Sequence, residues 1–246
     1  KSFFILTSII TCMYVFANIF SFDLESHGWA GIGDDWTTFQ EYSRQIVIEN
    51  EWLKAGEEVF YFRPGSRYIY AISHIIFGMS GFAYKMLNIW CICLSSFLVI
   101  KILKKMNCSI FLSYLAGTLL LGIYTADNFR WILMVGLSEY YAMICLMISL
   151  YLIINEEKLS NTKFILIVLL GITEIWLREE HAPVVISLIF LLKYKDETNN
   201  SSFFPYFKYL INYINNKKGI IIFYSSLIIM GFLSIFIRNY FVGGRI

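Results

Sequence analysis

Long apolar segments alternate with short polar ones along the chain. Seven of them approach the roughly 20 residues that a helix needs to cross a hydrocarbon core of about 30 Å. They cover residues 3–22, 83–103, 108–125, 139–154, 163–178, 182–194 and 219–238. The pattern predicts an all-α polytopic membrane protein, a single module over residues 1–246 with about seven transmembrane helices.

An eighth apolar segment, residues 66–80, would form a helix of only about 22 Å. The lysines decide whether it crosses the membrane. With seven spans and Lys1 in the cytoplasm, most lysines fall in cytoplasmic loops, as the positive-inside rule requires. An eighth span would place most of them outside. We therefore expect 66–80 to lie along the surface and 195–218 to form a cytoplasmic loop.

Residues 23–82 then form an outer loop with two juxtamembrane helices. The first is amphipathic, because apolar residues recur at near-helical spacing from Trp36 to Leu53. We expect Asp35 to cap this helix and Gly56 to mark its end. Pro64 suits the first turn of the second helix.

The composition excludes a soluble globule. Hydrophobic residues make up 58% and charged residues 15% of the 246 residues, against roughly 45–50% and about 25% in soluble domains. The net charge of +2 gives no argument for nucleic-acid binding. The five cysteines fall in or beside apolar segments, so neither a disulfide framework nor a zinc site is predicted. The sequence starts without Met and ends just after an apolar segment, as a fragment of a longer protein would.

Arginines on the outer face carry part of the candidate chemistry, because arginine suits bidentate contacts with phosphate or carboxylate. Arg63 and Arg67 flank a Pro-Gly break and could meet one anion, or instead reach lipid head groups. The quartet Arg178-Glu179-Glu180-His181 joins two short spans and must face protein or a water-filled cavity. It is either a functional cluster or an ion-pair corner that orders the two helices.

Acidic residues supply the other candidates. Asp34 and Asp35 could act as general base toward a hydroxyl at the membrane surface, cap a helix, or, as a weaker reading, bind a divalent cation. Glu139 begins the fourth span, where a carboxylate also suits the helix dipole. Glu174 lies four residues before Arg178, and we expect the two to pair.

The order of these features resembles the GT-C superfamily, polytopic glycosyltransferases that use polyprenyl-phosphate sugars and include protein mannosyltransferases and enzymes that add sugars to bacterial lipid A. Four segments carry the resemblance: GIGDDWTTFQEYSRQIV with its acidic pair, FRPGSRYIYAISHIIFG with its basic-Pro-Gly break, GLSE before the fourth span, and GITEIWLREEHAP between the short pair. The resemblance covers roughly residues 3–194.

The resemblance implies that Asp35, or else Asp34, deprotonates an acceptor hydroxyl. The acceptor oxygen would then displace the lipid phosphate at the anomeric carbon with inversion, while Arg63 and Arg178 stabilise the phosphate. The remaining substrate-binding candidates are Arg67, Glu139, Glu179 and His181. The donor would be a polyprenyl-phosphate sugar and the acceptor a glycan, lipid or protein. No certain cofactor and no metal-ligand set are implied.

We expect the protein in a membrane, with a bacterial inner membrane favoured by the Ile-, Lys- and Asn-rich composition, and with the site on the non-cytoplasmic side. The rival hypothesis is a transporter or flippase for a lipid-linked or anionic substrate. It predicts charges near the bilayer midplane instead of at its boundary. A membrane scaffold without activity is a third alternative.

We predict that Asp35→Asn abolishes sugar transfer while leaving the protein folded and inserted, because an amide cannot accept the acceptor proton. Sugar transfer in membranes and a far-UV circular dichroism spectrum measure the two effects. Asp34→Asn is the matched control. Full activity of Asp35→Asn would remove Asp35 as the base, and loss in Asp34→Asn alone would transfer the role to its neighbour.

Overall fold

The computed structural model describes residues 34–53, 63–77, 81–125, 138–154, 156, 159–191 and 203–243, with only the backbone for 34–40, 77, 81–86, 88–89, 124–125, 203–216 and 243. All regular structure within these ranges is helical. The elements are α2 (Asp34–Val47), α3 (Gly65–Phe77), α4 (Gly81–Lys105), α5 (Ile110–Thr125), α7 (Glu139–Ile153), α8 (Asn161–Leu177), η1 (Glu179–His181), α9 (Ala182–Ser187), η2 (Leu188–Leu191) and α10 (Phe203–Gly243).

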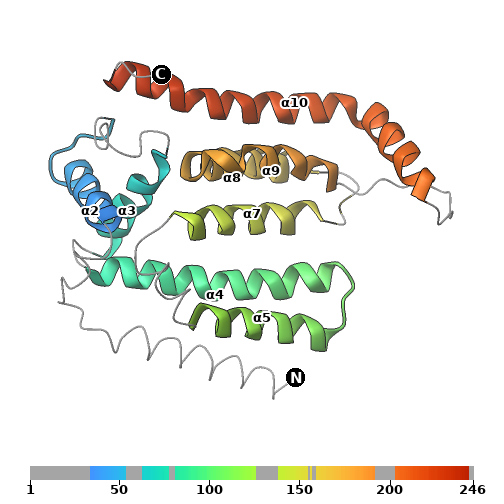
Figure 1. Cartoon of the computed structure of the whole chain (residues 1–246), viewed down its shortest axis with the longest axis horizontal. Coiled ribbons are helices and arrows are strands. Elements are labelled where there is room, and N and C mark those ends of the chain that lie inside the picture. The colour runs from blue at the N-terminus through green and yellow to red at the C-terminus, as the bar shows by residue number, and fades with distance from the viewer. Residues whose placement is uncertain are drawn as a thin grey trace.

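The longer helices lie side by side in a row (Figure 1). Helix α5 packs on α4, α4 on α7, α7 on α8 and α8 on α10, with α9 beside α8. The short helices α2 and α3 pack together at one end of the row. This end also receives the start of α7 and the end of α8, so polar residues from distant parts of the sequence meet there.

Helices occupy six of the seven predicted spans, and the first, residues 3–22, lies outside the described residues. Among the described helices, one is long and apolar enough to cross a membrane, over Lys217–Val242. Ile110–Ile123 and Glu139–Ile153 are shorter apolar helices. The described structure thus establishes an all-helical fold with one helix of spanning length.

Three predicted boundaries are wrong. Helix α10 begins at Phe203, inside the segment 195–218 predicted as a loop. Pro205 lies in the first turn, where a helix tolerates proline, and no later proline interrupts the helix. Figure 1 shows the first part of α10 bent away from the rest. Helix α2 ends at Val47, well before Gly56, and Asn50 beyond it adopts a positive φ of 61°. Asp34 already starts α2, so Asp35 lies in its first turn and is not the cap.

Two buried clusters hold the row together. One joins α8, α9 and α10 around Ile175, Val185 and Tyr224, and the other joins α3, α4 and α7 around Tyr70 and Cys145. Small residues allow close approach between helices, as in membrane bundles. A methyl group added at Gly171 would lie 2.7 Å from Val185 Cγ1, and one at Gly231 would lie 2.5 Å from Ile172 Cγ1.

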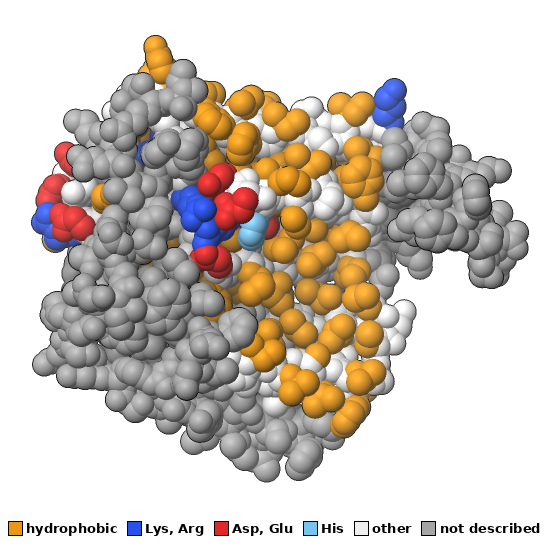
Figure 2. Space-filling view, viewed as in Figure 1, with side chains coloured by type: hydrophobic (Ala, Val, Ile, Leu, Met, Phe, Trp, Pro, Cys, Tyr) orange, Lys and Arg blue, Asp and Glu red, His pale blue; other side chains and the backbone are white. Residues whose placement is uncertain are grey.

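Large apolar side chains cover much of the outer surface (Figure 2). Exposed leucine, isoleucine, phenylalanine and methionine residues line α4, α5, α8 and α10. Soluble monomers rarely expose apolar surface on this scale, so it marks contact with lipid or with another protein. The surface is consistent with the low charge content of the sequence.

The two ends of the row carry different cations. At one end, Lys105 and Lys163 both pair with Glu156 at 2.9 Å. At the other, Arg63 and Arg178 contact the η1 turn, and Arg238 of α10 donates to the Leu53 carbonyl at 2.6 Å. Among these residues, the lysines lie at one end of the row and the arginines at the other, and the side of the membrane that each end faces stays a prediction.

The close approach of Gly65 to the backbone of α8 leads to a prediction about stability. A Cβ atom there would lie 2.9 Å from the Trp176 carbonyl carbon and oxygen, which belong to backbone and cannot rotate away. Gly65→Ala should therefore lower stability by roughly 1–3 kcal/mol, measured as a lower thermal midpoint in detergent. Gly122→Ala is the control, because its Cβ would meet nothing within 4 Å. Equal midpoints for the two variants would contradict the close approach of α3 to α8.

A candidate functional site at the arginine-rich helix ends

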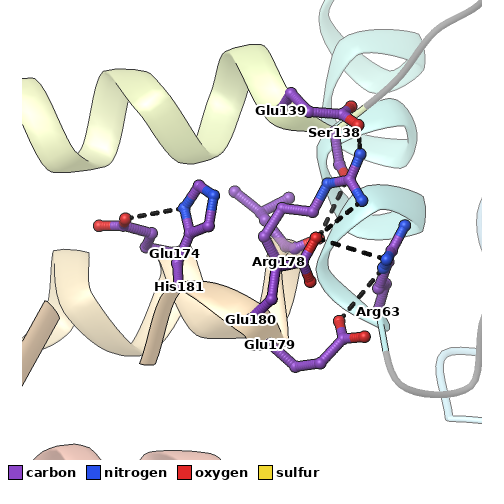
Figure 3. A network of polar contacts seen from close by, with 9 residues as sticks. Arg63, Ser138, Glu139, Glu174, Arg178, Glu179, Glu180 and His181 are labelled. Carbon is purple, nitrogen blue, oxygen red and sulfur yellow. Dashed lines mark hydrogen bonds and ion pairs between the residues drawn. The ribbon is translucent and has the colours of Figure 1, made fainter. Parts of the chain in front are cut away.

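The candidate site lies where α3 begins, α7 begins and α8 ends. Gly65 brings the start of α3 against the backbone of Trp176. Ser138, directly before α7, donates through Oγ to the Leu177 carbonyl at 3.0 Å, which joins α7 to the end of α8. These two contacts place Arg63, Glu139 and the turn after α8 around one point (Figure 3).

Two arginines more than a hundred residues apart in sequence share one carboxylate. Arg63 donates from Nε to Glu179 at 3.2 Å and from Nη2 to Glu180 Oε1 at 3.4 Å. Arg178 donates from Nη1 to the same Glu180 oxygen at 3.0 Å, and it also pairs with Glu139. Glu180 thus bridges the two guanidinium groups, and the described contacts tie α3, α7 and η1 into one network.

Burial differs sharply within this network. The Arg178 side chain is only 8% exposed, whereas those of Glu180 and Glu139 are 48% and 40% exposed. Burial acts to raise the pKa of Glu180, but its own backbone N–H, Arg63 and Arg178 outweigh this, and the pKa lies below the ordinary value. Glu180 is therefore an ionised and accessible anion that pairs with two guanidinium groups. One of them, that of Arg178, is buried.

Glu174 does not pair with Arg178 as the sequence predicted. It contacts His181, whose Nδ1 lies 3.0 Å from Glu174 Oε1. The backbone at Arg178 is extended, with φ −149° and ψ 96°, so its side chain leaves the helical direction on which the four-residue spacing depends. The following η1 turn then brings His181 back toward α8 (Figure 3).

Arg67 contacts α2. It is buried on α3, with its guanidinium 5.5 Å from the centre of the Tyr42 ring of α2. The same contact between α2 and α3 holds Ser43 Oγ 2.5 Å from His74 Nδ1. The convergence of Arg63 and Arg67 on one anion stays a prediction: Arg63 precedes α3, whereas Arg67 lies within α3 and its guanidinium faces the Tyr42 ring.

The acidic pair of the first outer loop is only partly placed. Asp34 and Asp35 begin α2, and α2 packs on α3, but their side chains lie outside the described part of the chain. The structure thus brings together Arg63, Arg178 and Glu179 of the predicted site. Glu139 joins the same network through Arg178, and His181 pairs with Glu174 beside it.

The sequence analysis missed two participants, Ser138 and Glu180 as the shared anion. A polar residue directly before an acidic helix start could have indicated Ser138, whereas nothing in the sequence shows which of two adjacent glutamates bridges two arginines. Within the described ranges, no group of three or more histidine, cysteine, aspartate or glutamate side chains could hold a metal, and the side chains of Asp34 and Asp35, the candidate cation ligands, are not among those described.

Loss of Arg178 should destabilise the protein more than loss of Arg63. Arg178→Gln removes the buried member of the network and leaves Glu139 and Glu180 facing each other, whereas Arg63 pairs are partly exposed and worth roughly 0–1 kcal/mol. Thermal unfolding of both variants in the same detergent measures the difference. A larger loss of thermal stability for Arg63→Gln would show that the contact between Arg63 and the η1 turn contributes more to stability than the buried Arg178 pairs.

No protein-family model, curated protein or solved structure matches this chain. The geometry of the site is therefore the evidence that bears on function.

Proposed function

We propose that this chain is the membrane module of a GT-C-like glycosyltransferase, with about seven transmembrane helices. It transfers a sugar from a polyprenyl-phosphate donor to a glycan, lipid or protein acceptor. One observation carries the proposal: Arg63 and Arg178, from two of the four segments that carry the resemblance, hold the same carboxylate oxygen of Glu180.

The Glu180 carboxylate marks where a phosphate would bind. Two guanidinium groups around one oxygen form a site for an oxyanion, and arginine matches phosphate as well as carboxylate. Because Glu180 is half exposed, a phosphate can replace it without opening the core. With Glu139 and Glu179 also present, the network holds three carboxylates against two arginines, so displacement of one carboxylate is needed before an anion binds.

The apolar surface beside the network suits the rest of the donor. In Figure 2 the charged side chains lie at the border of a broad apolar face. Such a border fits a ligand with a phosphate head and a hydrocarbon tail. The tail would lie along the apolar face while the head reaches the arginines.

The proposed chemistry is the one that the resemblance implies. Asp35, or Asp34, would take the proton of the acceptor hydroxyl, and the acceptor oxygen would attack the anomeric carbon as the bond to the phosphate oxygen breaks. The phosphate charge grows from −1 toward −2 in that step. Arg63 and Arg178 stabilise the growing charge, which lowers the barrier because the interaction is stronger in the transition state.

The position of the network favours an enzyme over the transporter hypothesis. Transport predicts charges near the middle of the helices, whereas Arg63 precedes α3, Glu139 starts α7 and Arg178 follows α8. With the lysine-rich end in the cytoplasm, the site faces the other side of the membrane, which in a bacterium is the outer face of the inner membrane.

Reconstitution tests the proposal directly. The protein is placed in liposomes with radiolabelled polyprenyl-phosphate sugars and with lipid, glycan or protein acceptors, and transfer of label is measured. The matched variant is Arg63→Ala/Arg178→Ala. Equal transfer by the wild type and this double variant would show that the arginines do not bind the donor.

Arg178→Ala should raise the apparent donor constant by about tenfold or more, because a charge-assisted hydrogen bond contributes roughly 1.5–3 kcal/mol. Arg44→Ala is the matched control: Arg44 also pairs with two glutamates, Glu41 and Glu49, but on the exposed side of α2. Initial rates against donor concentration provide the measurement. An unchanged apparent donor constant would mean that the segment Arg178-Glu179-Glu180-His181 only orders the two helices that it joins.

A further inference from the structure

A second pair of ionisable groups adjoins the arginine network. Glu174 has no exposed surface, and its Oε1 lies 3.0 Å from His181 Nδ1. Its Oε2 is buried and has no hydrogen-bond partner among the residues that the structure describes. A carboxylate in that position is costly, so its retention needs a reason beyond packing.

The pair connects the interior to the surface. The His181 side chain is 29% exposed, and Figure 2 shows a histidine at the surface directly beside the arginines and acids of the network. Figure 3 shows the imidazole between Glu174 and Arg178. A buried carboxylate that fixes one ring nitrogen leaves the other nitrogen for a ligand, as in carboxylate–histidine pairs generally.

Counting protons shows what Nε2 can offer. The Nδ1–Oε1 contact requires one proton between the two atoms, and with that proton alone Nε2 carries a lone pair. A second proton gives Nε2 an N–H group, whichever partner holds the first. The pair therefore presents a hydrogen-bond acceptor or a donor at Nε2, depending on one proton.

The neighbouring charges couple that proton to an anion. Burial lowers the pKa of His181, Glu179 and Glu180 act to raise it, and Arg178 acts to lower it. Glu174 faces the ring from α8, and Arg63 and Glu139 join through Glu180 and Arg178. An anion arriving at the arginines adds negative charge near the ring and favours the second proton.

We propose that Glu174 and His181 form a proton-donating pair that binds the phosphate of the ligand through Nε2–H, beside Arg63 and Arg178. The identity of the ligand as a phosphodiester rests on the proposed function. When the bond from the anomeric carbon to the phosphate oxygen breaks, its electron pair stays on that oxygen. The Nε2 proton moves to the phosphate, and the pair then regains a proton from water.

Binding of a simple phosphodiester tests the pair without sugar transfer. Dibutyl phosphate is soluble and keeps a single charge over the range in which histidine titrates. Protein with labelled histidine in detergent micelles is titrated with pH, with and without this compound, and the imidazole signals are followed by NMR. The His181 signal is assigned with His181→Asn, and the signal of His74, held by Ser43 between α2 and α3, is the internal control.

We expect dibutyl phosphate to raise the pKa of His181 by about one unit, which by linkage means about tenfold tighter binding to the doubly protonated pair than to the singly protonated one. Affinity should therefore fall as pH rises. Glu174→Gln should remove most of this pH dependence. His181→Asn should remove all of it while leaving the buried carboxylate intact, which covers the case in which Glu174→Gln does not fold.

An unchanged His181 signal at saturating dibutyl phosphate would overturn the proposed role of the pair. The same holds if the affinity for dibutyl phosphate still depends on pH in His181→Asn. A comparison with dihexadecyl phosphate separates this inference from the proposed function. Equal affinity for the two compounds would contradict a lipid-borne donor, yet the response of His181 to either would still support the pair.

Discussion

The shared contact of Arg63 and Arg178 with Glu180 is the interaction on which the arrangement of this end of the protein depends. Arg178 is almost wholly buried, and a buried guanidinium must keep anionic partners. Its partners come from α7 and from the η1 turn, and through Glu180 they also hold the start of α3. The need to neutralise one buried cation therefore determines how three segments meet.

The need to neutralise the buried Arg178 guanidinium also explains how the same residues can stabilise the fold and offer a site for an anion. The carboxylates that stabilise the folded protein occupy the positions that an incoming anion would take. A site of this kind is stable when empty and exchanges one internal anion for an external one on binding. Glu180 is suited to leave because water already reaches half of its side chain.

In the proposed function, the exposed apolar surface places this site at the boundary of a membrane. Lysines and Glu156 gather at one end of the helix row and arginines with glutamates at the other, with an exposed apolar face between them. An amphiphilic ligand with an anionic head matches the arginine-rich end of such a surface. The buried Glu174–His181 pair adds a proton-dependent component that neither arginine can supply.

The sequence by itself determined the helical character and the approximate positions of most helices, because apolar segment length, Pro64 and the polar breaks are local signals; the start of α10 and the end of α2 differ. It also predicted that lysines and arginines gather at opposite ends of the helices, and the pairs of Lys105, Lys163, Arg63 and Arg178 lie at opposite ends of the row. Tertiary structure alone decided the partners: Glu174 meets His181 and not Arg178, and Arg67 contacts Tyr42 of α2. The physical reason is that an extended residue after α8 and the packing of α2 on α3 redirect side chains, which helical spacing cannot predict.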